Sequence, residues 1–157
     1  VYQTETRREK CAVMVSTKGR YALRVMLDMA EQSGGGNIRL KDIAARQSIS
    51  KKYLEQIVPL LNNAGLLRTS RGFQGGYSLA VPADRITVGD VLRITEGSLA
   101  PIPCLESDPP GCERSAHCET LPVWQGLYDV VNNYLDGITV QDIVDSARTN
   151  GADDYVI

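Results

Sequence analysis

The 157-residue sequence is poor in aromatic residues, and it lacks the signatures of several protein classes. It has no apolar run of about 18 residues, so we predict neither a transmembrane helix nor a membrane partner. It has no basic segment followed by an apolar stretch and a small-residue cleavage site, which argues against secretion and favours a cytoplasmic protein. The glycines of 34–36 lack the spacing of a P-loop or dinucleotide-binding motif, and no internal repeat is present.

Histidine is also scarce, because His117 is the only one. A Cys–His nucleophile would have to use it, and neither an orienting partner nor an oxyanion site is evident beside it. The sequence therefore predicts no enzyme and no small-molecule substrate. With 43% apolar residues the chain is too hydrophobic to be disordered, and its length suits one domain with a helical appendage.

The formal net charge of −2 hides an uneven distribution. Residues 14–81 carry ten Lys and Arg against four Asp and Glu, a charge of +6. Residues 82–157 carry four basic and 13 acidic residues, a charge of −9. The basic half favours a nucleic-acid partner, and the asymmetry indicates that the two halves have different tasks.

The basic half is predicted to form three helices and a hairpin. Apolar residues recur at helical spacing over 18–32 and 40–47, and Ser50 can cap a third helix that ends near residue 65 and bends at Pro59. Residues 66–70 and 77–81 are strand candidates, joined by a glycine-rich turn. Helix, short helix, helix and hairpin, in this order, are typical of a winged helix-turn-helix.

The acidic half is predicted to contain further helices around an irregular loop. Thr87 with Asp90, and Thr139 with Asp142, have the spacing of capped helix starts. Residues 100–119 are rich in proline and cannot form one regular element. The helix that follows, Pro122–Leu135, carries an apolar stripe at Val123, Leu127, Val130, Val131 and Tyr134, which favours burial against a second copy.

The fold class that follows is mostly α with a small β-wing, a winged helix-turn-helix domain plus a long C-terminal dimerisation helix. We divide the chain into a disordered tail or remnant of an extension (1–13), the winged domain (14–82), a connecting helix with the cysteine loop (83–120), the dimerisation and C-terminal helices (121–148) and a tail (149–157). Met14 is a plausible natural start, since the regular pattern begins just after it.

Residues at the start of the third helix and in the hairpin turn are the candidate DNA contacts. Gln56 suits adenine and Glu55 suits cytosine, whereas Lys51 and Lys52 suit phosphates and Arg71 suits a minor groove. The Tyr53 ring can equally belong to the core. The alternative is a solvated basic face on an interaction domain. The full set is Ser50, Lys51, Lys52, Tyr53, Glu55, Gln56, Arg71, Gly72 and Gly75.

Three of the four cysteines, Cys104, Cys112 and Cys118, fall within 15 residues, whereas Cys11 lies apart and is interpreted as incidental. Thiolates on one irregular loop can converge on zinc, copper(I) or an iron–sulfur cluster. The close cysteine pair of most zinc sites is absent, so the wide spacing favours a cluster. A Cys112–Cys118 disulfide, a redox-switch pair and thiols without a role are the alternatives. His117 is a candidate fourth ligand, or else a solvent-exposed side chain.

Four segments together resemble a known family. STKGRYALRVMLDMA, SISKKYLEQIVPLLNNAGLL, RGFQGGYSLA and ITVGDVLRITEG resemble the IscR/CymR/NsrR family of bacterial winged-helix transcription regulators, over about residues 14–146. YLEQ and RGxxGGY are the most distinctive stretches. The resemblance implies a homodimer that binds promoter DNA, with Pro122–Leu135 as the dimer helix and Trp124 near its start.

The resemblance also implies roles for individual residues, and it is strongest to the iron–sulfur regulators. Cys104, Cys112 and Cys118 match ligands of an iron–sulfur cluster, 2Fe–2S rather than 4Fe–4S. Two departures stand out: the first cysteine gap has seven residues instead of five, and Leu121 occupies the position of the usual histidine ligand. His117, Glu119 or a group from the partner's first helix would have to replace that ligand.

In the same branch the glutamate at the Glu55 position helps to discriminate operator types with cluster state, and Arg71 with its following glycines matches the wing. The sequence thus predicts a homodimeric transcription regulator that senses iron–sulfur status and controls iron–sulfur biogenesis genes. Alternatives are a regulator that responds to nitric oxide, thiol redox state or cysteine metabolism, and a zinc-binding interaction module without DNA binding.

Overall fold

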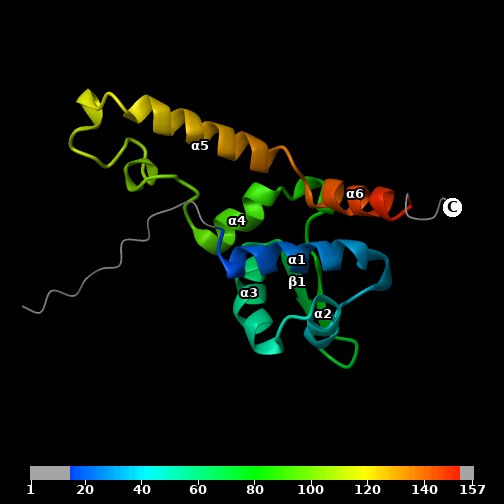
Figure 1. Cartoon of the computed structure of the whole chain (residues 1–157). Helices are drawn as coiled ribbons and strands as arrows, with labels where there is room; N and C mark the ends of the chain where they lie inside the picture. Colours follow the sequence, from blue (N-terminus) through cyan, green and yellow to red (C-terminus); the bar gives the residue numbers. More distant parts are fainter. Residues whose placement is uncertain (1–14, 153–157) are drawn as a thin grey trace, which may run out of the picture.

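Six α-helices and one two-stranded sheet make up residues 15–152, the part of the chain that the computed structural model describes (Figure 1). The main elements are α1 (Thr17–Glu31), α2 (Leu40–Gln47), α3 (Lys51–Asn63), β1 (Leu67–Ser70), β2 (Gly76–Leu79), α4 (Val88–Glu96), α5 (Leu121–Asp136) and α6 (Val140–Ala152). Short 3₁₀ turns η1 (Ser33–Gly35), η2 (Ala83–Arg85), η3 (Pro103–Leu105) and η4 (Ser115–His117) connect them. The expectations for residues 1–13, Met14 and Cys11 concern residues outside this range.

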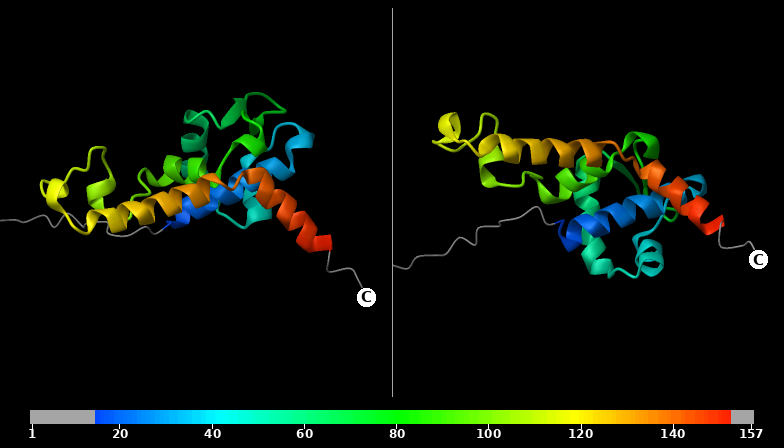
Figure 2. Two further views of the ribbon diagram at one scale, coloured as in Figure 1. Left: turned by 90° about the horizontal axis from the view of Figure 1, so that it is seen from above. Right: turned by 45° about the horizontal axis from the view of Figure 1, so that its top comes forward.

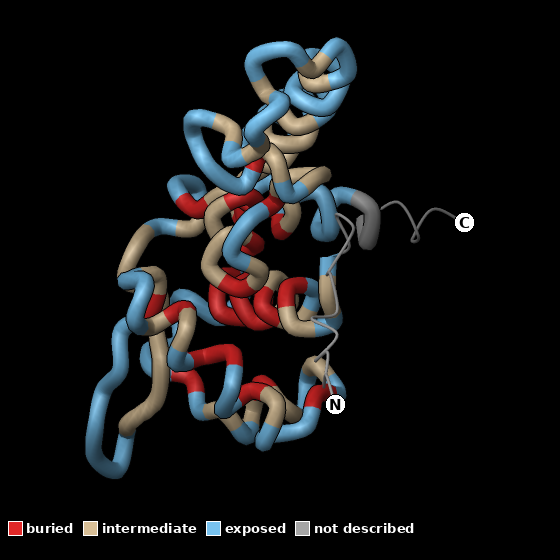
Figure 3. The backbone as a smooth tube through the Cα atoms, turned by 90° about the vertical axis from the view of Figure 1, so that its left-hand side faces the viewer, coloured by how far each residue is buried: buried red, intermediate tan, exposed pale blue. Residues whose placement is uncertain are grey.

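The central helix is α1, and helices α2, α3, α4 and α6 all pack on it. Its apolar positions Ala22, Val25, Met26 and Met29 are fully buried. They meet the buried face of α3, which includes Leu54, Ile57 and Leu61, so the helical periodicity of both segments is explained by one shared core. Figure 3 shows this buried centre surrounded by exposed connections.

The predicted winged helix-turn-helix is present, with element bounds close to those expected. The bounds of α2 agree with the prediction, and β1 pairs antiparallel with β2 in a register that sets Leu67 opposite Leu79. The glycine-rich stretch after α1 contains the 3₁₀ turn η1, and α3 includes Pro59 and extends to Asn63.

A second, smaller core joins α4 to the C-terminal helices. Val88 and Leu92 of α4 and Leu99 after it are buried, and Tyr128 and Leu135 of α5 pack against them. Tyr128 lies at the middle of α5 and Leu135 near its C-terminal end. The N-terminal half extends away from the body together with the cysteine loop, as Figure 2 shows.

The predicted fold class of mostly helix with a small β-wing is confirmed. At the C-terminal end α6 runs to Ala152 and so extends beyond residue 148, the expected end of the C-terminal helix. Among the described residues no helix is both long and apolar enough to cross a membrane.

Candidate nucleic-acid interface and cysteine loop

The first two turns of α3 present most of the polar residues that the sequence singled out. The Ser50 side chain accepts a hydrogen bond from the Tyr53 backbone N–H at 3.2 Å, which caps the helix as predicted. Lys51, Lys52, Glu55 and Gln56 are all exposed. Lys51 Nζ lies 3.4 Å from Glu55 Oε1, so this carboxylate already has a cationic partner.

Tyr53 behaves differently from its neighbours on α3, because its ring belongs partly to the core. It packs edge-on against Tyr21 of α1, with ring centroids 5.3 Å apart and an interplanar angle of 76°. The side chain is half-buried. Its ring therefore fixes α3 against α1, and only the outer part of the side chain remains for a ligand.

A network of polar side chains holds α2 against α1. The carboxylate of Asp28, which is 1% exposed, accepts hydrogen bonds from Arg46 Nε at 2.9 Å and Arg46 Nη2 at 2.7 Å. Gln47 Nε2 donates to the same carboxylate at 3.1 Å, and Arg24 donates to Gln47. The Asp28 carboxylate raises the pKa of Arg46. Because α2 leads directly into α3, this network also sets the position of α3.

The loop between β1 and β2 forms a tight turn that carries Arg71, Gly72 and Gly75. The Gly75 N–H donates to the Gly72 carbonyl at 2.9 Å, and Gly72 adopts a positive φ of 108°. A Cβ at Gly75 would lie 2.7 Å from the Ser70 carbonyl oxygen, so this position has no room for a side chain. Arg71 is exposed.

Residues between α1 and α2 form hydrogen bonds with β2 and with this turn. Ile38 exchanges two backbone hydrogen bonds of 2.8 Å with Tyr77 of β2. Arg39 Nη2 donates to the Phe73 carbonyl at 2.9 Å, and Asn37 Nδ2 donates to the Gln74 carbonyl at 3.2 Å. Sequence reasoning missed both of these supports and Phe73 itself, although Phe73 is the only phenylalanine and stands between the glycines of the turn.

The α3 start and the β1–β2 turn lie at the same end of the molecule, at the bottom of Figure 1, whereas α5 lies at the top. The structure thus brings the predicted DNA contacts to one end. The cysteine loop, residues 100–119, is on the α5 side (Figures 1 and 2).

The three cysteines of this loop are free, half-buried thiols. Cys104 lies in η3, and partial burial, with a smaller contribution from the Cys112 thiol, raises the pKa of Cys104. Cys118 lies directly after η4, with its Sγ 3.4 Å from Thr120 Oγ1. Hydrogen bonds from the side chain and backbone of Thr120 lower the pKa of Cys118.

The donor set of the loop fits a thiolate-bound cluster in chemistry, because three free sulfurs are accessible on one segment. The predicted convergence of the three thiols is not found: within residues 15–152 no group of three or more His, Cys, Asp or Glu side chains is arranged to hold a metal ion. Cys104 lies in η3 and Cys118 directly after η4, and the Cys118 thiol contacts Thr120 at the start of α5. The candidate ligands His117 and Glu119 are exposed, and Leu121 is the first residue of α5.

An ion pair fixes α5 to α4. Arg93 donates to both carboxylate oxygens of Asp136, at 2.7 and 2.8 Å, and to Asn132 Oδ1 at 2.9 Å. The Arg93 guanidinium lowers the pKa of Asp136. The cysteine loop and α5 are therefore joined to the body through α4.

The outward face of α5 is apolar. Val123, Leu127, Val130 and Tyr134 are between 45% and 67% exposed, and Trp124 is 38% exposed. Except for the half-buried Val131, the stripe that the sequence predicted is this exposed face, and none of the residues of α5 is buried.

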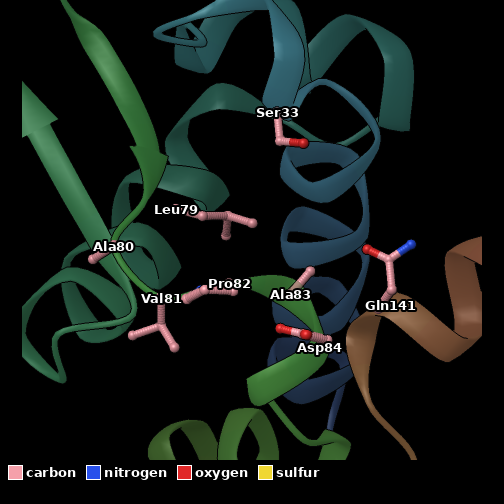
Figure 4. Close-up of a pocket in the computed structure, with 8 residues that line it drawn as sticks. All are labelled: Ser33, Leu79, Ala80, Val81, Pro82, Ala83, Asp84 and Gln141. Carbon is pink, nitrogen blue, oxygen red and sulfur yellow. The ribbon is translucent and has the colours of Figure 1, made fainter.

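An open hollow of about 600 Å³ lies between the end of β2, η2 and the start of α6 (Figure 4). Its walls are formed by Val81, Pro82 and Asp84 from one side and by Gln141 from the other. None of the residues predicted for DNA or metal binding lines it.

The comparisons with known proteins agree with this geometry. A family profile described as Rrf2, iron-dependent transcriptional regulator, matches residues 15–146. The chain belongs to the Rrf2 family. The resemblance inferred from the sequence is thereby confirmed.

Both curated and solved relatives cover most of the chain. The Rrf2 protein CymR of Bacillus subtilis, an HTH-type transcriptional regulator, is 40% identical over 129 residues, which are 82% of this chain and 88% of CymR. IscR of Aliivibrio salmonicida is 37% identical over 130 residues, 83% of this chain and 76% of IscR.

Solved Rrf2 structures show the same architecture. The structure of CymR, the global cysteine regulator of B. subtilis, has a TM-score of 0.70 at 38% identity and covers 85% of this chain and 97% of its own. The IscR structure from T. potens has a TM-score of 0.67 at 38% identity, with coverage of 85% and 88%. This Rrf2 protein is thus a transcriptional regulator of the winged-helix type and not an enzyme.

Proposed function

We propose that this chain is a homodimeric, cytoplasmic regulator that binds promoter DNA and senses iron–sulfur cluster status, and that it controls iron–sulfur biogenesis genes. The observation that carries the proposal is the position of three free thiols, Cys104, Cys112 and Cys118, on the loop between α4 and the exposed helix α5. A ligand on this loop would lie at the N-terminal end of α5, next to the surface that a second copy would cover.

Cluster binding is supported by the chemistry of the loop. Thiolates are the ligands of iron–sulfur clusters, and such a cluster supplies a group that responds to iron supply and oxidation. The three thiols of the described loop are not arranged to hold a metal ion, so binding a cluster requires them to move together. The loop is irregular and mostly exposed, so this movement leaves the core intact.

Dimerisation is supported by the apolar face of α5. Large apolar side chains in a row on one exposed helix are unfavourable in water, and they mark an interaction surface. A second copy offers an identical helix with the same stripe, which is the self-complementary surface that a two-fold dimer needs.

DNA binding is supported by the other end of the molecule. Ser50, Lys51, Lys52, Glu55 and Gln56 are exposed at the start of α3, where the side chains of a recognition helix reach base edges. The wing with Arg71, Gly72 and Gly75 lies at the same end. The ion pair between Lys51 and Glu55 implies that Glu55 reads a base only after it leaves Lys51.

The test is anaerobic purification of the full chain, followed by absorbance spectroscopy and by iron and sulfide analysis. We expect coloured protein containing iron and sulfide, and we expect Cys112→Ser to lose both. Ser115→Ala, on the same loop, is the matched control and keeps the colour. His117→Ala reports whether this side chain is a ligand. Colourless protein from iron-replete cells would contradict cluster binding and leave DNA binding untouched.

A second candidate signal is thiol redox state, cysteine metabolism or nitric oxide. It is favoured by the neighbouring thiols of Cys104 and Cys112 and by the similarity to a relative described as a global cysteine regulator. Colourless protein whose DNA affinity changes on thiol oxidation would support it, and operator release from the coloured form by nitric oxide would indicate a nitric oxide sensor. Bound zinc, with DNA affinity unaffected by Gln56→Ala and Arg71→Ala, would instead indicate an interaction module.

A further inference from the structure

Phe73 is the most exposed large apolar side chain of the described residues, at 93%. It is also the only phenylalanine of the chain. A phenyl ring in water is unfavourable relative to a buried one, and the exposed ring contributes nothing to the core of this molecule. Binding of a partner that removes the ring from water would therefore be favourable.

The turn that carries Phe73 is held in place from three sides. The Gly75 N–H closes the turn on the Gly72 carbonyl at 2.9 Å. Arg39 holds the Phe73 carbonyl at 2.9 Å, and Asn37 holds the next carbonyl at 3.2 Å. Because these contacts fix the backbone on both sides of the ring, the ring is presented from a preorganised support, which reduces the entropy lost on binding.

The surroundings of the ring indicate a polyanionic partner. Arg71 lies two residues before Phe73, and Arg39 donates to the Phe73 carbonyl; both arginines are exposed, and neither forms a salt bridge within the described residues. The tip also lies at the same end as the start of α3 (Figure 1). An aromatic ring framed by arginines on a narrow turn fits a minor groove better than it fits a flat protein surface.

We propose that Phe73 enters the minor groove of bound duplex DNA as an apolar wedge and partly unstacks one base step, while Arg71 contacts the adjacent backbone. This inference rests on the proposed DNA-binding function. An apolar wedge makes no hydrogen bond to a base. Its sequence specificity comes from the free-energy cost of deforming the base step that it enters. It therefore selects flexible pyrimidine–purine steps at a position flanking the bases that α3 reads.

The two side chains then contribute in different ways. A phosphate contact by Arg71 releases counterions, so its contribution falls as salt rises. The contribution of the Phe73 ring is apolar and nearly independent of salt. Measuring DNA affinity at several salt concentrations thus distinguishes the contribution of the Phe73 ring from that of the Arg71 charge.

The experiment uses the full chain and a duplex that the wild-type protein selects from a random library. Hydroxyl-radical footprinting first locates the minor-groove step that the wing protects, and 2-aminopurine is then placed in that step. For Phe73→Ala we expect about tenfold weaker binding, an unchanged salt slope and loss of the fluorescence increase that reports unstacking. Phe73→Leu keeps most of the affinity, whereas Arg71→Ala lowers the salt slope by about one.

Gln74→Ala is the matched control, because it removes the neighbouring exposed side chain and leaves the supported backbone unchanged. Thermal unfolding should be the same for all of these variants, since the ring makes no core contact. Equal affinity and equal fluorescence for Phe73→Ala and wild type would overturn the wedge and leave the ring for a protein partner. If wild type selects no duplex at all, the proposed DNA-binding function fails, and the wedge fails with it.

Discussion

The main chains of Thr87 and Thr139 lie side by side as an isolated antiparallel bridge. Two hydrogen bonds of 2.9 and 2.8 Å join the segments 86–88 and 138–140 on either side of them. Each threonine also begins a helix, Thr87 for α4 and Thr139 for α6. The connection after the wing and the connection after α5 are thus fastened together at one point.

Removing the ion pair between Arg93 and Asp136 should loosen α5 without unfolding the head. Both side chains are more than a third exposed, so we expect Asp136→Asn to reduce the free energy of unfolding by only about 0.5–1 kcal/mol. Urea denaturation measures the loss, and Asp129→Asn on the same helix is the control. A loss as large as that of a buried ion pair would contradict this estimate.

The same ion pair gives a dependence on pH. Because Arg93 lowers the pKa of Asp136 in the folded state, the stabilisation is fully present above the ordinary carboxyl value of 3.8. It is lost as the pH falls below 3.8 and through the lower folded pKa. Wild type and Asp136→Asn should therefore converge in stability at strongly acidic pH, which denaturation at several pH values would show.

Asp28 is the most deeply buried charged residue of the head, and its removal should be costly. Asp28→Asn leaves Arg46 without its ionic partner, and we expect a loss of about 2–3 kcal/mol because Arg46 can still turn towards solvent. Glu31→Gln, at the exposed end of the same helix, is the control. Equal midpoints of urea unfolding for the two variants would contradict a structural role for this network.

Glu96 caps α1 from a distance of 80 residues in sequence. Its Oε1 accepts hydrogen bonds from Ser16 Oγ at 2.7 Å and from the backbone N–H groups of Ser16 and Gly19 at 3.1 Å each. Glu96→Ala should therefore cost about 1–2 kcal/mol of stability. Thermal unfolding checks this, with the exposed Glu106→Ala as the control. No shift in the midpoint would show that Ser16 caps the helix unaided.

A charge in the apolar face of α5 should separate the proposed dimer. Val130 is 66% exposed, so Val130→Asp leaves the fold of one chain intact while it places a carboxylate in the dimer surface. Light scattering should report a monomer, and DNA affinity should fall because two heads no longer bind together. Gln125→Asp, which helical spacing places on the other side of α5, should stay dimeric. A monomeric wild type would contradict the proposed dimer itself.

Local patterns predicted most of the fold. The apolar spacing of 40–47 gave the bounds of α2, and the spacing of Thr87 to Asp90 gave the capping box that starts α4. The glycines of the wing marked a turn because they allow positive φ and close backbone approach. These features depend on neighbours within four residues, and the sequence shows such neighbours directly.

Contacts between distant residues were not predictable. The pairs Arg93–Asp136 and Ser16–Glu96 join residues 43 and 80 positions apart, and no spacing rule selects them among many charged residues. The cysteines show the same limit. Their clustering in sequence indicated a shared ligand, but two separate 3₁₀ turns and the Thr120 contact decide where the sulfurs lie.

The bridge between Thr87 and Thr139 anchors α5 at its C-terminal end, so α5 can act as a lever whose fulcrum lies at this bridge. The 16 residues of α5 span about 24 Å from that fulcrum to the cysteine loop, at 1.5 Å per residue. A tilt of about 5° at the fulcrum moves the far end by roughly 2 Å, the scale on which helices shift at subunit interfaces. If a ligand displaces the cysteine loop by this amount, the point where α4 and α6 begin would experience only a small rotation of α5.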